Sequence, residues 1–131
     1  MDLNGVTEKI IGCAFKVGNT LGVGFLEAVY ENALVHELRK TGLLVEQQKM
    51  LEVWYDGIVV GNYRADLLIE NAIIVELKAV TTLDSKHFSQ CMNYLKTTGL
   101  TLCLLINFGN PKVEIKRVVR FPKMERIQNI S

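Results

Sequence analysis

The stretch that decides the fold is RADLLIENAIIVELKA, residues 64–79. It holds two apolar runs, residues 67–69 and 73–75, on either side of a three-residue loop at 70–72. Strands that are apolar at consecutive positions are typically covered on both faces. The pattern therefore predicts a β-hairpin in the middle of a sheet, with charged residues at its open end.

Three charged side chains lie at that open end: Asp66, Glu76 and Lys78. If the three-residue loop sets the register, Asp66 opposes Glu76. Because side chains alternate along a strand, Lys78 shares a face with Glu76. A slip of one residue would move Asp66 to the other face. We predict that two carboxylates and one amine converge at one edge of the sheet.

This set of groups suits phosphodiester hydrolysis. Asp66 and Glu76 supply carboxylate ligands for Mg²⁺ or Mn²⁺, and the backbone carbonyl of Leu77 can add a third oxygen. Such an ion polarises the phosphate and helps to ionise a water, while Lys78 orients that water or neutralises the phosphoryl oxygens. The alternative is that these are exposed strand-end residues, because a [DE]-x-K triplet is expected about once by chance in such a chain.

The rest of the chain predicts one α/β domain over residues 1–131. Apolar periodicity and turn residues predict the element order ααβββαββ around a central mixed sheet. The expected helices cover residues 3–19, about 25 to 41, and 84 or 85 to 98. The expected strands cover residues 45–55, 58–65, 101–107 and 113–119, with two strand pieces at 66–69 and 73–78 around the loop at 70–72.

Composition limits the class of protein. Apolar residues make up 49% of the chain and charged residues 22%, which is typical of a globular protein. The net charge of +1 means that any nucleic-acid binding must come from a local patch. With no apolar run of membrane-spanning length and no visible signal peptide, we expect a cytoplasmic protein without a membrane partner.

Two groups of residues carry weaker hypotheses. The cysteines Cys13, Cys91 and Cys103 lack zinc spacing, so we expect reduced, partly buried thiols. A nucleophilic pair of Cys91 with His87 is less favoured, since Cys91 lies on an apolar helix stripe. Six basic residues near the end form either a nucleic-acid contact or a solvated strand and tail. They are Lys112, Lys116, Arg117, Arg120, Lys123 and Arg126.

The hairpin pattern at residues 64–68 and 74–79 resembles that of the PD-(D/E)xK nuclease superfamily. Ala65 stands where the superfamily is named for a proline. Gln90 and Tyr94 form a Q-x-x-x-Y pattern that resembles a motif of the RecB-like exonuclease branch. Residues 24–30, GFLEAVY, match G-x-x-E-x-x-Y, which names a family of small proteins in this superfamily. The resemblance covers about residues 22–119.

The resemblance implies a restriction-endonuclease-like core and a metal-dependent nuclease acting on DNA or RNA. It makes Asp66 and Glu76 metal ligands and Lys78 the catalytic cation. We also expect a homodimer, because so small a chain covers little substrate alone. The alternatives are a catalytically inactive module that binds nucleic acid or protein, and a toxin–antitoxin-type interaction protein. The last would show a large exposed apolar patch without convergent carboxylates.

Helix residues are expected to assist. Glu27 is predicted to lean toward the sheet edge as a third carboxylate that binds the metal directly or through water, with a solvated helix glutamate as the alternative. Gln90 and Tyr94 are predicted to hold the phosphate or Lys78 by hydrogen bonds. Their alternative is an amide and a phenol at a core boundary. Tyr30 belongs to a buried stripe and is interpreted as core.

Overall fold

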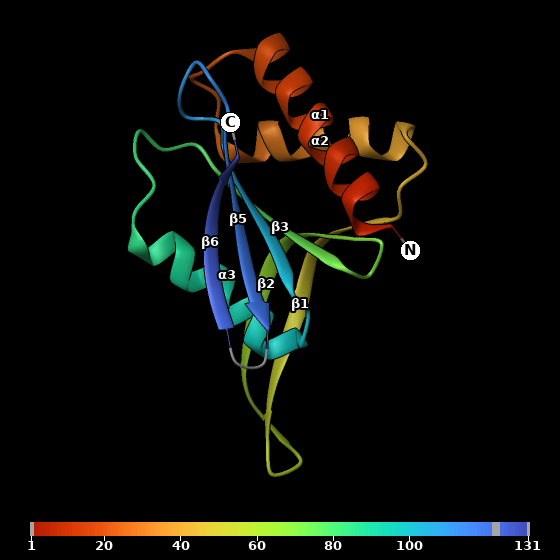
Figure 1. Cartoon of the computed structure of the whole chain (residues 1–131), viewed down its shortest axis with the longest axis vertical. Coiled ribbons are helices and arrows are strands. Elements are labelled where there is room, and N and C mark those ends of the chain that lie inside the picture. The colour runs from red at the N-terminus through yellow and green to blue at the C-terminus, as the bar shows by residue number, and fades with distance from the viewer. Residues whose placement is uncertain (1, 122–123, 131) are drawn as a thin grey trace.

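The computed structural model describes residues 2–121 and 124–130, which form a six-stranded sheet with helices on both faces (Figure 1). The α/β class and the mixed sheet predicted from the sequence are confirmed. The elements are α1 (Leu3–Leu21), α2 (Glu27–Lys40), β1 (Val45–Tyr55), β2 (Ile58–Ile69), β3 (Ile73–Lys78), α3 (Ser85–Thr98), β4 (Leu102–Asn107), β5 (Glu114–Phe121) and β6 (Met124–Ile130).

The strands lie in chain order, β1-β2-β3-β4-β5-β6. Only β3 and β4 are parallel, because α3 carries the chain back across the sheet between them. Two details of the predicted order were wrong. Residues 58–69 form one continuous strand, and β6 adds a strand beyond the predicted last one. As an edge strand of mixed polarity, β6 has no apolar alternation that would reveal it.

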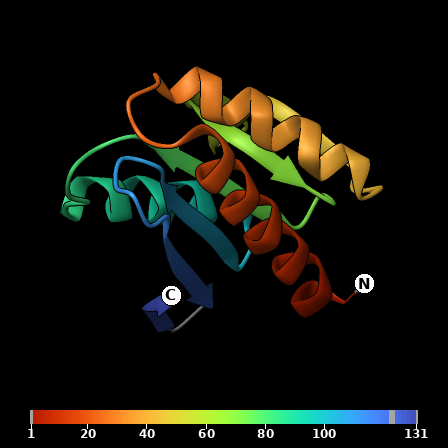
Figure 2. The same ribbon diagram turned by 90° about the horizontal axis from the view of Figure 1, so that it is seen from above.

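The helices divide between the two faces of the sheet: α1 and α2 cover one face and α3 covers the other (Figure 2). Ile73, Val75 and Leu77 of β3 pack in the core beneath α1 and α2, whereas Ile74 packs toward α3. Strand alternation therefore places Glu76 on the α3 face. Within the described residues, no helix is long and apolar enough to cross a membrane.

The β2–β3 hairpin has the predicted register. Ile69 pairs with Ile73 and Leu67 with Val75 across the loop at residues 70–72. Glu70 and Asn71 adopt positive φ angles of 54° and 53° in this tight turn. The register brings Asp66 opposite Glu76, at the point where regular pairing between the two strands ends.

Candidate active site

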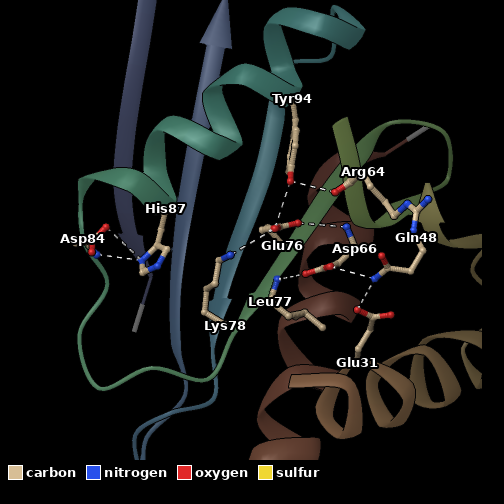
Figure 3. A network of polar contacts seen from close by, with 10 residues as sticks. All are labelled: Glu31, Gln48, Arg64, Asp66, Glu76, Leu77, Lys78, Asp84, His87 and Tyr94. Atoms are coloured by element: carbon tan, nitrogen blue, oxygen red, sulfur yellow. Dashed lines mark hydrogen bonds and ion pairs between the residues drawn. The ribbon is translucent and has the colours of Figure 1, made fainter. Parts of the chain in front are cut away.

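The site forms where β2 separates from β3 (Figure 3). Beyond the Leu67–Val75 pair, side chains take over the hydrogen bonds of the ladder. The Asp66 N–H donates to Oε1 of Glu76 at 3.2 Å, and the Leu77 N–H donates to Oδ2 of Asp66 at 2.8 Å. Each carboxylate thus accepts a backbone N–H from the opposite strand. This exchange fixes both carboxyl groups in one place.

Glu76 is a buried acid with 3% of its surface exposed. Burial raises its pKa to about 8, and the nearby charge of Asp66 adds to this rise. The N–H of Asp66 and the charge of Lys78 lower the pKa and only partly offset it. Two crowded carboxyl groups, of which the buried Glu76 has a raised pKa, favour either a proton or a cation between them.

Lys78 completes the predicted trio. Its Nζ lies 3.6 Å from Oε2 of Glu76, and its side chain is 15% exposed. Since residues 76 and 78 lie on the same face of β3, the ammonium group stands beside the two carboxyl groups. The structure therefore brings Asp66, Glu76 and Lys78 together, as the register predicted.

Tyr94 reaches the site from α3. Its hydroxyl donates to the Arg64 carbonyl at 3.0 Å and lies 3.4 Å from Oε2 of Glu76. Burial raises the pKa of Tyr94, and the charges of Glu76 and Asp66 raise it further. A hydrogen bond with Gln90, half-buried one turn earlier, acts in the opposite direction. The phenol therefore stays a neutral donor above the carboxylates, and Gln90 contacts the site through Tyr94.

The carboxylate that α2 contributes to this network is Glu31. Glu31 is 7% exposed, and its Oε1 accepts from Nε2 of Gln48 at 2.8 Å. The same Nε2 donates to Oδ1 of Asp66 at 3.1 Å. Gln48 has a φ of 54°, an uncommon angle for a residue other than glycine, and it forms no regular β1–β2 pair although its neighbours on both sides do. It connects α2 with the hairpin.

The prediction for Glu27 requires correction. Glu27 is exposed at the first turn of α2 and takes no part in the hydrogen bonds described above. Glu31, one turn later on the same side of the helix, holds the position that we assigned to Glu27. Neither Glu31 nor Gln48 was predicted. The run of four polar residues at 46–49, within a strand whose other residues are mostly apolar, is a sequence signal that could have drawn attention to Gln48.

The donor set limits the kind of metal that fits. Among the residues that the structure describes, no three His, Cys, Asp or Glu side chains group as a metal site. The described residues thus do not offer the three or four side-chain ligands that a structural zinc site uses. Mg²⁺ binds through one or two carboxylates and keeps several waters. The facing carboxyl groups of Asp66 and Glu76 fit that requirement.

His87 and the cysteines have structural surroundings. His87 Nδ1 accepts the N–H of Asp84 at 3.1 Å and completes a capping box at the start of α3. The His87 side chain is thus half-buried at the start of α3. All three cysteines are free and buried, and Cys91 is fully enclosed in the core. A nucleophilic Cys91–His87 pair is excluded by that enclosure.

Two of the basic residues near the end of the chain lie on opposite faces of the sheet. Lys116 and Arg117 are consecutive on β5 and so point to opposite faces of the sheet. Lys116 donates to Asn129 Oδ1 at 2.7 Å. Lys123 lies outside the described residues, as does the side chain of Arg126.

Comparisons with known proteins give one match. A family model described as the PD-(D/E)XK nuclease superfamily matches residues 4–118. The match includes every element from α2 to β4 and all the residues of the site. Neither the search of curated proteins nor the search of solved structures gave a significant match.

Proposed function

The chain belongs to the PD-(D/E)XK nuclease superfamily, and from this membership we propose that it is a metal-dependent nuclease that hydrolyses phosphodiester bonds in DNA or RNA. Its mixed sheet flanked by helices is consistent with a restriction-endonuclease-like fold. The residues at 24–30 support placing it in the GxxExxY group of that superfamily.

One observation carries the proposal: Asp66 and Glu76 face each other where β2 leaves β3, with Lys78 beside them. A purely structural strand end has no reason to place a second carboxyl group beside the buried Glu76, because two ionised carboxylates there would repel each other and destabilise the fold. Superfamily members generally are nucleases, and the three residues occupy the positions of the named motif. A role in substrate chemistry would explain why the chain keeps an arrangement that lowers its stability.

Mg²⁺ or Mn²⁺ would be held by Asp66, Glu76 and the carbonyl oxygen of Leu77, and would supply Lewis-acid charge to the phosphate and its attacking water. Four side chains of the protein would bind the phosphate or position the carboxyl groups. Lys78 donates to the phosphoryl oxygens and stabilises the negative charge that develops on them. Tyr94, with Gln90 behind it, holds the Glu76 carboxyl in place. Gln48 does the same for Asp66.

The competing interpretation is a module that retains the fold without catalysis and binds a nucleic acid or a protein. Exposed apolar side chains on the β1–β2 hairpin favour it, because such clusters often mark interaction surfaces. They are Met50, Trp54, Tyr55, Ile58, Val59, Val60 and Tyr63. A toxin–antitoxin-type protein would share that patch but would lack the convergent carboxylates. We also propose a homodimer, which sedimentation of the whole chain would test.

The test is cleavage of labelled single- and double-stranded DNA and RNA with Mg²⁺, with Mn²⁺ and with a chelator. We expect metal-dependent products from the wild type and none from Lys78→Ala or Asp66→Asn. Lys9→Ala, which alters an exposed lysine on α1, is the matched control and should cleave normally. Activity that survives in Lys78→Ala would remove the mechanism.

Calorimetry separates the two candidate functions. A nuclease of this design should bind Mn²⁺ with measurable heat, and Asp66→Ala should abolish that heat. Equal heats for the two proteins, together with no cleavage of any of the four substrates, would favour the inactive module.

A further inference from the structure

A groove runs beside the candidate active site, between α3 and β2. Its volume is about 610 Å³, and it is lined by Tyr63, Ser85, Lys86, His87, Ser89, Gln90 and Asn93. The volume is in the range of ligand sites in proteins. Of these seven described residues, six are polar side chains of α3 and one is an aromatic ring of β2.

Two tyrosines connect the groove to the carboxylates: Tyr63 lines the groove, and Tyr94 lies between Tyr63 and Glu76. Tyr63 packs against Tyr94 in an edge-to-face contact, with ring centroids 5.8 Å apart and an interplanar angle of 68°. Tyr94 in turn approaches Glu76 to 3.4 Å. Gln90 lines the groove and lies one helical turn from Tyr94, whose pKa it lowers slightly. A ligand in the groove would therefore lie next to the phosphate position.

The lining has the chemistry of a nucleotide site. Tyr63 keeps 38% of its surface exposed and offers a flat apolar ring. Gln90 and Asn93 carry amides that can both donate and accept, as base edges require. Lys86 is an exposed cation suited to a phosphate, and none of the seven lining residues is a carboxylate that would repel one.

We propose that this groove binds an unpaired nucleotide of a single-stranded nucleic acid, with its base against Tyr63 and its backbone beside Lys86. The inference rests on the proposed nuclease function, which it deepens by naming the substrate class. Stacking on Tyr63 needs a base whose face is free, as it is in a single strand.

The start of α3 does not itself provide the site. Asp84 and His87 already cap it, and the Lys86 N–H is bonded to Oδ1 of Asp84 at 2.9 Å. The helix amides are thus occupied, and recognition has to come from side chains. One lysine along the groove also matches one backbone strand better than the two phosphate rows of a duplex.

The test measures binding without catalysis. The full-length chain, in a chelating buffer, is titrated into fluorescein-labelled oligothymidylate, oligouridylate and a duplex of equal length. We expect preference for the single strands. Tyr63→Ala should weaken that binding about tenfold, because stacking of one base on an aromatic ring is worth about that factor. Tyr63→Phe should bind as the wild type does.

Further variants keep the inference falsifiable if Tyr63→Ala unfolds. Asn93→Ala should weaken single-strand binding several-fold. Lys86→Ala should lower the slope of log affinity against log salt by about one. Phe121→Ala and Lys9→Ala are matched controls, since both residues are exposed and neither lines the groove.

The outcomes separate this inference from the nuclease proposal. Equal single-strand affinity in the wild type, Asn93→Ala and Lys86→Ala would overturn the groove, even if the protein cleaves nucleic acid. Preference for the duplex, or no binding to either single strand, would overturn it as well. Single-strand binding that the groove variants weaken, without cleavage of any substrate, would support the proposed nucleotide groove and contradict the proposed nuclease activity.

Discussion

The carboxylate of Asp66 accepts the backbone N–H of Leu77 at 2.8 Å, one step beyond the last β2–β3 pair. A side chain thus replaces a rung of the sheet at the point where the strands diverge. Glu76 accepts the Asp66 N–H in return. Each acid therefore holds the two strands together and also supplies a carboxyl group to the site. Substitutions at these positions must therefore be designed to keep the hydrogen bond while removing the charge.

Asp66→Asn and Asp66→Ala should differ in stability. Asparagine keeps a carbonyl oxygen for the Leu77 N–H, whereas alanine leaves that N–H without its acceptor. We expect Asp66→Asn to be more stable than Asp66→Ala by about 1–3 kcal/mol, the usual cost of an unsatisfied buried group. Urea unfolding at fixed pH measures the difference. Equal midpoints would show that the Leu77 bond contributes nothing to the fold.

Glu76→Gln should stabilise the metal-free protein in alkaline solution. The folded pKa of about 8 lies above the ordinary value of 4.5, so the folded state holds a proton that the unfolded chain has released. The stability linked to Glu76 is therefore full below about pH 4.5 and is lost as the pH rises toward 8. We expect a gain on the order of 2 kcal/mol or more at about pH 9, and little change at about pH 5.

Thermal unfolding in a chelating buffer at the two pH values tests this expectation. Mg²⁺ should reduce the advantage of the glutamine variant at high pH, because a cation offsets the same repulsion in the wild type. A variant less stable than the wild type at both pH values would contradict the sign of the argument.

The hairpin could be predicted from the sequence because its geometry is local. A three-residue loop fixes the register, and strand alternation then places Asp66, Glu76 and Lys78 on one face. The residue that α2 contributes was harder to predict. The sequence shows which face of a helix packs on the sheet, but not how far along the sheet each turn of the helix lies. Glu27 and Glu31 are one turn apart on the same side of α2 and differ only in their position along the sheet.

Gln48 was missed for a related reason. Its role depends on a contact with Glu31, 17 residues earlier, and one with Asp66, 18 residues later. No periodicity encodes such a bridge. Its positive φ also departs from the extended backbone that the strand pattern predicts.

Gln48 should affect both stability and metal affinity. Gln48→Ala and Gln48→Gly both remove the bridge, but only glycine relieves the backbone strain, so it should be more stable by about 1 kcal/mol. Both should weaken Mn²⁺ binding several-fold in calorimetry, because Asp66 loses a positioning hydrogen bond. Gln47→Ala is the matched control, since Gln47 bonds Glu31 and Asn32 but not Asp66. The same loss of affinity in Gln47→Ala would refute a specific role for Gln48.

Tyr30 should prove to be a stabilising residue and not a catalytic one. It is 1% exposed and stacks on Phe108 with ring centroids 4.8 Å apart. Its hydroxyl donates to the Gly22 carbonyl at 2.6 Å and accepts the Phe25 N–H at 3.2 Å, which fastens the loop before α2. Tyr30→Phe keeps the stack and loses both bonds, so we expect a destabilisation of about 1–2 kcal/mol.

Hydrogen exchange locates that effect in Tyr30→Phe. The Phe25 amide should exchange faster, while amides of β3 change only as much as global stability does. Cleavage per folded molecule should equal that of the wild type, because none of the hydrogen bonds of Tyr30 reaches Asp66, Glu76 or Lys78. A large drop in the cleavage rate with unchanged stability would place Tyr30 in the catalytic machinery instead, and its spacing from Glu27 in the G-x-x-E-x-x-Y pattern would then need a chemical explanation.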